Sequence, residues 1–189
     1  MPPFLRPYPL NGPPLPVIFL DVDGVLNRMP VHIRHGRSWV SVPPSNGYWV
    51  DVDHVAIASL DALFREFSGR CELVWLTTWG REVVLLEDVL RGTLRGGFVT
   101  AERPMGRFVA MSWKLNALVA HLADRDNPPF VWIDDEAISD AVLSSPDFAG
   151  GKNQGGEPRL LIEPKPGDGI TLEHIAAIRA FLDQHASRM

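Results

Sequence analysis

Short apolar runs that alternate with helical patterns are the feature of this sequence that most restricts its fold. Four runs rich in β-branched and aromatic side chains stand out: Val17–Leu20, Glu72–Leu76, Phe130–Ile133 and Arg159–Ile162. A continuous apolar run predicts a strand that is buried on both faces, and strands separated by helices predict a parallel sheet. We therefore expect a three-layer, Rossmann-like α/β fold with a mostly parallel central sheet.

Helical patterns lie between these runs. Apolar residues at helical spacing predict a helix over Asp53–Phe67, which Gly69 closes. Further helices are expected on the same grounds at Arg81–Leu90, Trp113–Leu122 and Thr171–His185, the last with Thr171 as its N-cap. Gly96–Thr100 has the length of a short additional strand.

The remaining segments suggest the domain limits. A chain of 189 residues suits one domain. Residues 1–16 hold seven prolines and predict an extended leader, so residues 17–189 are expected to form the single domain. Asn27–Trp49 lacks periodicity and predicts a long loop or flap at about residues 27–50, at most a small cap.

Composition excludes several classes of protein. The formal net charge of −5 argues against a wholly basic nucleic-acid binder, although a local basic groove remains compatible with it. The single cysteine, Cys71, allows no internal disulfide. The apolar runs are too short to span a bilayer, and the N-terminus lacks the apolar core of a signal peptide. We expect a cytoplasmic protein, with no membrane association and no obligate protein partner indicated.

Polar side chains follow three of the predicted strands. They form the pairs Asp21/Asp23, Thr77/Thr78 and Asp134/Asp135. Ligands of parallel α/β sheets bind beyond the carboxyl ends of the strands, so these pairs are expected to meet. Like charges at the end of a buried strand raise each other's ionisation cost, and such pairs persist where a cation and an anionic substrate hold them. The residues alone suggest a metal-assisted phosphoryl site.

The same residues resemble the haloacid dehalogenase (HAD) superfamily of phosphatases. Its Asp-x-Asp-Gly-Val motif matches Asp21–Val25, and its Ser/Thr after an apolar strand matches Thr77. Its later lysine, at the start of a helix, matches Lys114, and its paired acids match Asp134 and Asp135. Order and spacing agree over roughly residues 17 to 136. The second acid, Asp23, distinguishes the phosphatases from the dehalogenase branch.

This resemblance implies a mechanism and a cofactor. Asp21 would attack phosphorus and form an aspartyl phosphate, while Asp23 would act as general acid and base. Lys114 and one of the two threonines, Thr77 or Thr78, would hold the phosphate. The implied Mg²⁺ ligands are Asp21, Asp23 through its backbone carbonyl, Asp134 and Asp135. The expected activity is that of a Mg²⁺-dependent phosphohydrolase acting on phosphomonoesters.

The resemblance also bears on the substrate. Leu76–Trp79 and Trp113–Lys114 are similar to the HAD domains associated with RNA-repair proteins. The interval between these motifs is too short for a large cap, and an open site goes with larger substrates within the family. A phosphorylated small molecule or a nucleic-acid end is therefore expected. Candidate substrate contacts in the flap are Arg28, Arg34, Arg37 and Trp39.

Other interpretations remain open at this stage. Asp21 and Asp23 fit an Asp-Gly turn, and Asp134 and Asp135 fit a helix cap. Lys114 fits a surface lysine, in which case the phosphate-binding cation would be Arg103, Arg107 or Lys152.

Two other functions use the same residues. A phosphotransferase or mutase would pass the aspartyl phosphate to a hydroxyl group. A non-catalytic module would bind phosphate or nucleic acid without turnover.

Overall fold

Five parallel strands form the centre of the molecule. The computed structural model describes residues 14–29, 38–42, 46–86, 97–98, 113–144 and 158–186. The strands lie in the order β5-β4-β1-β6-β7. Their bounds are β1 (Val17–Leu20), β4 (Glu72–Trp75), β5 (Gly97–Phe98), β6 (Phe130–Ile133) and β7 (Arg159–Ile162). The predicted α/β fold with a parallel sheet is confirmed.

The apolar runs are continuous because both faces of the sheet are covered. All four residues of β1 are fully buried, and Val17 lies opposite Glu72 of β4 and Phe130 of β6. Ile18 belongs to one apolar core and Phe19 to the other. Because successive side chains point to opposite faces, one strand contributes to two cores and needs apolar residues at every position.

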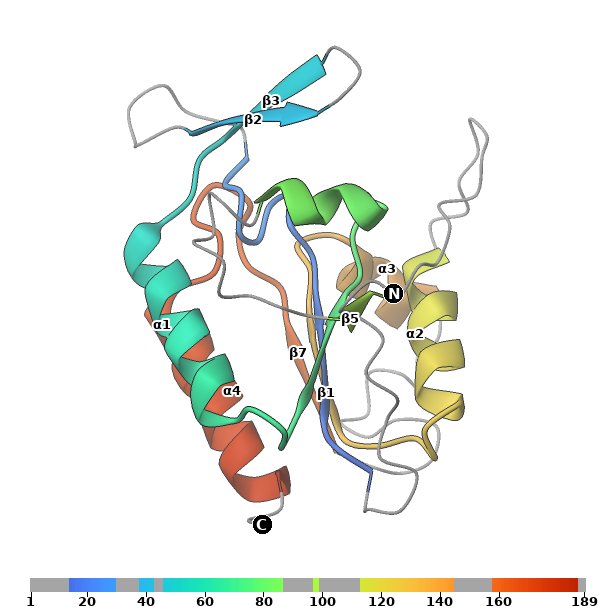
Figure 1. The fold of residues 1–189 in the computed structure, drawn as a ribbon. Helices are drawn as coiled ribbons and strands as arrows, with labels where there is room; N and C mark the ends of the chain where they lie inside the picture. Colours follow the sequence, from blue (N-terminus) through green and yellow to red (C-terminus); the bar gives the residue numbers. More distant parts are fainter. Residues whose placement is uncertain are drawn as a thin grey trace, which may run out of the picture.

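Helices cover both faces of the sheet (Figure 1). One face of the sheet carries α1 (His54–Glu66) and α4 (Leu172–His185), and the other carries α2 (Trp113–Ala123) and α3 (Ala137–Ser144). The helix starts have clear local causes. The Asp53 side chain accepts hydrogen bonds from two backbone N–H groups of α1, and Thr171 forms a capping box with His174 at the start of α4.

Two segments differ from the sequence-based expectation. The segment expected as a loop or flap contains an antiparallel hairpin of β2 (Ser38–Val42) and β3 (Asn46–Val50), in which Trp39 pairs with Trp49. The helix expected over Arg81–Leu90 is a 3-10 helix, η1 (Gly80–Leu86), within the part described. The hairpin was missed because prolines and a glycine at residues 43–47, between and at the edge of its strands, obscure the short β pattern.

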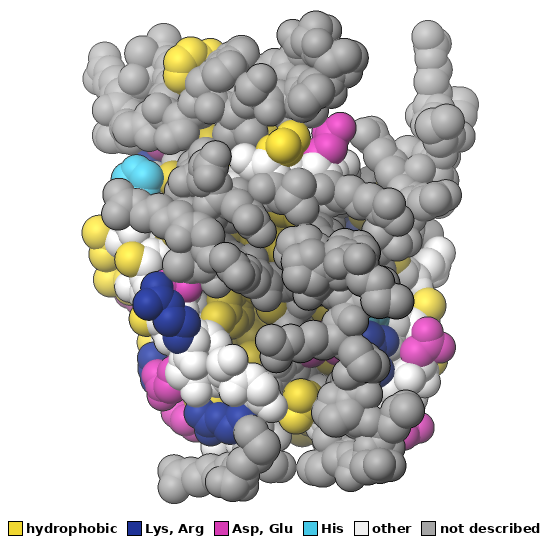
Figure 2. All heavy atoms as spheres, in the orientation of Figure 1, with side chains coloured by type: hydrophobic (Ala, Val, Ile, Leu, Met, Phe, Trp, Pro, Cys, Tyr) yellow, Lys and Arg dark blue, Asp and Glu magenta, His cyan; other side chains and the backbone are white. Residues whose placement is uncertain are grey.

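The outer surface of the helices carries charged side chains beside a few exposed apolar ones, among them Val55 and Leu172. In Figure 2, side chains of both charges lie side by side over α1 and α4. Arg179 of α4 forms an ion pair with Glu66 of α1, with an N–O distance of 2.5 Å. Among the helices in the described part of the chain, none has the length and apolar character needed to cross a membrane.

Candidate active site

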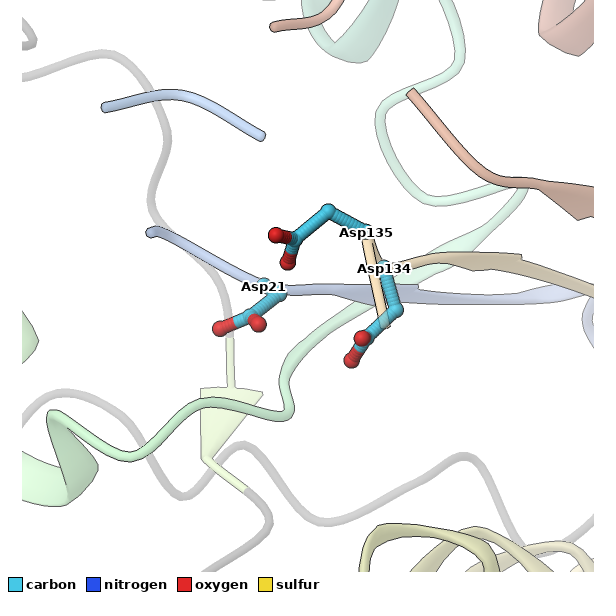
Figure 3. Close-up of side chains that lie close together, drawn as sticks. All are labelled: Asp21, Asp134 and Asp135. Carbon is cyan, nitrogen blue, oxygen red and sulfur yellow. The ribbon is translucent and has the colours of Figure 1, made fainter. Parts of the chain in front are cut away.

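Three carboxylates converge where β1 and β6 end (Figure 3). Oxygen atoms of Asp21, Asp134 and Asp135 all lie within 4.8 Å of one another. Backbone hydrogen bonds set this position, because Asp21 N donates to Ile133 O over 3.0 Å and Asp134 N donates to Ile162 O over 3.1 Å. Sheet register therefore brings two distant parts of the sequence to one point.

Lys114 joins two of these acids. Its Nζ lies 2.5 Å from Oδ2 of Asp21 and 2.6 Å from Oδ2 of Asp134. The lysine is in the first turn of α2, and all three residues are buried. The interpretation of Lys114 as a surface lysine is thereby excluded. The alternatives Arg103, Arg107 and Lys152 lie outside the described residues.

Burial shifts the pKa values of the acidic groups in this site. Burial raises the pKa of Asp21 to about 7, although the Lys114 ammonium opposes this, and the nearby Asp134 raises it further. The pKa of Asp135 rises to about 6, from burial first and then from Asp134. Burial lowers the pKa of Lys114, but the two carboxylates outweigh that effect and raise it. Among the described residues, Lys114 is thus the cation that faces these three carboxylates.

This donor set fits a divalent cation. Mg²⁺ prefers carboxylate oxygens and completes its shell with water and substrate phosphate. Asp21, Asp134 and Asp135 offer three such oxygens close together, and within the described part of the chain Lys114 is the cation paired with them, which leaves an excess of negative charge there. The residues present therefore fit the predicted Mg²⁺.

A family model describes the same region of the chain. The model for the HAD domain in Swiss Army Knife RNA repair proteins matches residues 17–175. The chain belongs to this family. The predicted membership of the HAD superfamily, with an association with RNA repair, is confirmed. Searches of curated proteins and of solved structures found no match.

Gly24 brings the first motif of this HAD domain against its last. Its φ of +74° is left-handed, and a Cβ there would lie 2.1 Å from Cγ of Asp135. A side chain at this position would therefore displace the Asp135 carboxylate. The Asp-Gly pair makes the predicted turn, but it also makes room for one of the clustered acids.

Asp23 has different partners. Its Oδ1 accepts from Nδ2 of Asn27 over 2.7 Å, and its Oδ2 accepts from Nε1 of Trp79 over 2.9 Å. Among the described acids, the convergent group is formed by Asp21, Asp134 and Asp135, so the Asp23 side chain stands apart from it. Asp21 and Asp23 therefore have separate surroundings, which would suit two carboxylates with different roles.

The two threonines differ in exposure. Thr77 is buried, whereas Thr78 is exposed. The Thr77 hydroxyl oxygen accepts from the backbone N–H of Trp79 over 3.3 Å, and the chain then enters η1. Thr77 therefore also shapes the turn. Similarly, Asp134 Oδ1 accepts from the Glu136 backbone N–H before α3 while its Oδ2 binds Lys114.

The flap residues are only partly described. Arg28 forms an ion pair with Asp51, with an N–O distance of 2.7 Å, at the base of the hairpin. The side chains of Arg34, Arg37 and Trp39 lie outside the described part of the structure. Their predicted contacts with substrate stay predictions.

Asn27, Asp51 and the indole of Trp79 were not among the predicted site residues. Asn27 and Trp79 donate to Asp23, and the backbone N–H of Asp51 donates to Asn27, so Asp23 is joined to the base of the hairpin and to the segment after β4. Trp79 was visible as part of the Leu-Thr-Thr-Trp resemblance, but no spacing in the sequence indicated that it reaches Asp23.

Proposed function

We propose that this HAD domain is a Mg²⁺-dependent phosphohydrolase that removes phosphate from monoesters through an aspartyl phosphate on Asp21. The observation that carries the proposal is the buried bridge from Lys114 to Asp21 and Asp134, beside Asp135. An acidic cluster used only for stability would be unusual, because burying like charges opposes folding. Residues 17–189 would act as one catalytic domain, with the hairpin as its flap.

The reaction would have two stages. A carboxylate oxygen of Asp21 attacks phosphorus, the bond from phosphorus to the leaving oxygen breaks, and Asp23 gives that oxygen a proton. Asp23 then removes a proton from water, the water oxygen attacks phosphorus, and inorganic phosphate leaves as Asp21 is regenerated. Atoms and charge balance without an oxidant or reductant.

The other residues would hold the reacting groups. Two N–H donors of the Lys114 ammonium bind Asp21 and Asp134, and we assign its third to a phosphate oxygen. The Thr77 hydroxyl, with Thr78 beside it, would bind another phosphate oxygen. Mg²⁺ would be held by Asp21, Asp134 and Asp135 with the backbone carbonyl of Asp23. When bound, it would offset the negative charge of nucleophile and phosphate.

The proposed substrate is a phosphorylated nucleotide or nucleic-acid end. This choice is supported by the family's description, which names RNA repair proteins. A phosphorylated small molecule would use the same chemistry, so the substrate panel must include both.

Phosphate release tests the proposal. Wild type and Asp21→Asn would be incubated with phosphomonoesters, including 5′- and 3′-phosphorylated oligonucleotides, in Mg²⁺ and in EDTA. We expect metal-dependent release that is lost in the folded variant. Full activity of Asp21→Asn would contradict the mechanism. Phosphorylated product after addition of alcohol acceptors would instead identify a phosphotransferase, and tight binding without release would identify a binding module.

A further inference from the structure

The Asp23 carboxylate is held on both sides. Asn27 donates to one oxygen over 2.7 Å, and the Trp79 indole donates to the other over 2.9 Å. Hydrogen bonds to an ionised carboxylate are stronger than neutral ones and have defined directions. Because each oxygen has a donor of its own, the plane of the carboxylate is set by two residues from different segments.

Asn27 is itself held in one orientation. It is buried, and its Oδ1 accepts from the backbone N–H of Asp51 over 2.9 Å. One end of the amide is thus engaged by Asp51 and the other by Asp23. Rotation of the amide by half a turn would place an acceptor against the Asp23 carboxylate and a donor against a backbone N–H, losing both bonds.

Asp51 links this arrangement to the base of the hairpin. It follows β3 directly, and its Oδ1 accepts from Nη2 of Arg28 over 2.7 Å. The backbone N–H of Arg28 donates to the Asp51 carbonyl over 2.8 Å. The residues that enter and leave the hairpin segment are therefore joined next to Asn27.

Trp79 reaches Asp23 from a different segment of the chain. It follows Thr77 and Thr78 after β4, and its partly buried ring packs against the core between the sheet and helices α1 and α4. Packing of a rigid ring restricts the indole N–H to a small region. A donor held in this way is suited to orienting a carboxylate.

We propose that Trp79 and Asn27 are positioning residues, which hold the Asp23 carboxylate in the orientation required for proton transfer to the leaving oxygen. This inference rests on the proposed function. It assigns two residues, outside the sequence-predicted site, to the acid/base half of the reaction. Replacing Trp79 or Asn27 should therefore slow the reaction most for substrates whose leaving group must be protonated.

Two substrates separate this role from a general structural one. The leaving group of p-nitrophenyl phosphate departs as a stable anion, whereas an alkyl leaving group such as a ribose hydroxyl must gain a proton. The value of kcat/KM reports the reaction only up to departure of the leaving group, so the later attack by water does not contribute.

The variant Trp79→Phe keeps an aromatic ring and removes the donor. We expect kcat/KM to fall about tenfold or more for the alkyl phosphate and less than about twofold for p-nitrophenyl phosphate, since general acid catalysis contributes 10²–10⁴. Asn27→Ala should show the same selectivity. Trp75→Phe, at a buried core position of β4, is the matched control and should show none.

A second measurement separates an effect that acts through Asp23 from a general effect on folding. In an Asp23→Asn background, Trp79→Phe should cause no further selective loss, because residues that act through one group are not additive. Equal losses of kcat/KM on both substrates would overturn the positioning role, and so would a selective loss in the Asp23→Asn background as large as in the wild type. In either case, phosphate release by the wild type would still support the proposed function. Absence of phosphate release from the wild type would overturn both.

Discussion

Replacing Lys114 with methionine tests the charge balance on which the site depends. Methionine has a similar length and no charge, so the change leaves the shape of α2 nearly unaltered. It removes the cation that lies 2.5 Å from Asp21 and 2.6 Å from Asp134. The two carboxylates are 4% and 0% exposed, so water cannot replace the lost partner.

The expected magnitude follows from this burial. Removing one partner of a buried ion pair typically destabilises a protein by about 3–5 kcal/mol, because it leaves an uncompensated buried charge. Here the cation contacts two carboxylates and a third lies nearby. We expect the free energy of unfolding to fall by about 3–5 kcal/mol at pH 8 in EDTA. Addition of Mg²⁺ should restore more stability to the variant than it adds to the wild type, since a bound cation stabilises the folded state.

Urea unfolding of wild type and Lys114→Met in EDTA and in Mg²⁺ measures both effects. Lys165→Met, at an exposed position, controls for the loss of a lysine and should change the free energy of unfolding by less than about 0.5 kcal/mol. A loss of less than about 1 kcal/mol for Lys114→Met would refute the reasoning. If Mg²⁺ raised the free energy of unfolding equally in variant and wild type, that would also contradict the reasoning. The Lys114 ammonium and Mg²⁺ would then not be compensating the charge of the same carboxylates.

Three further outcomes are expected. In EDTA, burial raises the pKa of Asp21 in the folded protein to about 7, above the ordinary value of 3.8 that applies in the unfolded chain. Its contribution to stability is therefore present below about pH 4 and is lost as pH rises through 7. Between these pH values, the free energy of unfolding of the wild type should fall by up to about 1.4 kcal/mol per pH unit relative to that of Asp21→Asn, as measured by urea unfolding at several pH values. Parallel plots of unfolding free energy against pH for the two proteins would contradict this. Gly24→Ala should reduce phosphate release at least about tenfold, because the added Cβ displaces Asp135 and a small misplacement is costly in catalysis. Gly69→Ala is the control, since the φ of Gly69, +76°, is nearly that of Gly24, +74°. This control variant should lose only about 1 kcal/mol of stability. Cys71 is partly buried, and burial raises the pKa of its thiol to about 12. Iodoacetamide at pH 8 should therefore label the native thiol at least about tenfold more slowly than the unfolded one, as followed by mass spectrometry, and equal rates would contradict the raised pKa.

The sheet could be predicted because its signal is local. Val17–Leu20 and Phe130–Ile133 are apolar at every position, and the structure shows each contributing to two cores. The start of α4 was also visible, since the predicted cap Thr171 acts on the backbone N–H of His174, three residues away. The helix predicted from Asp53 begins one residue later, at His54, because Asp53 is its N-cap. The β2–β3 hairpin was not visible, because its short strands gain their order from pairing with each other rather than from a strong pattern in either.

The order and residue types of the candidate site were also readable from the sequence. Asp21, Thr77 and Asp134 each follow a predicted strand, and parallel strands end at a common edge. The partners of each group were another matter. Asp21 is 93 residues from Lys114, and Asp23 is 56 residues from Trp79. No periodicity in either segment encodes such a contact.

Strand composition, helix caps and the identities of the acidic residues depend on neighbours within a few positions, so the linear sequence was enough to establish the α/β class and the family resemblance. The protonation of Asp21, the burial of Lys114 and the two donors on Asp23 depend on which surfaces the sheet brings together. Burial strengthens electrostatic interactions and removes the water that would otherwise screen them. These properties exist only once the layers have packed, and for that reason the tertiary structure alone distinguishes Lys114 from a surface lysine and Asp23 from the acids beside it.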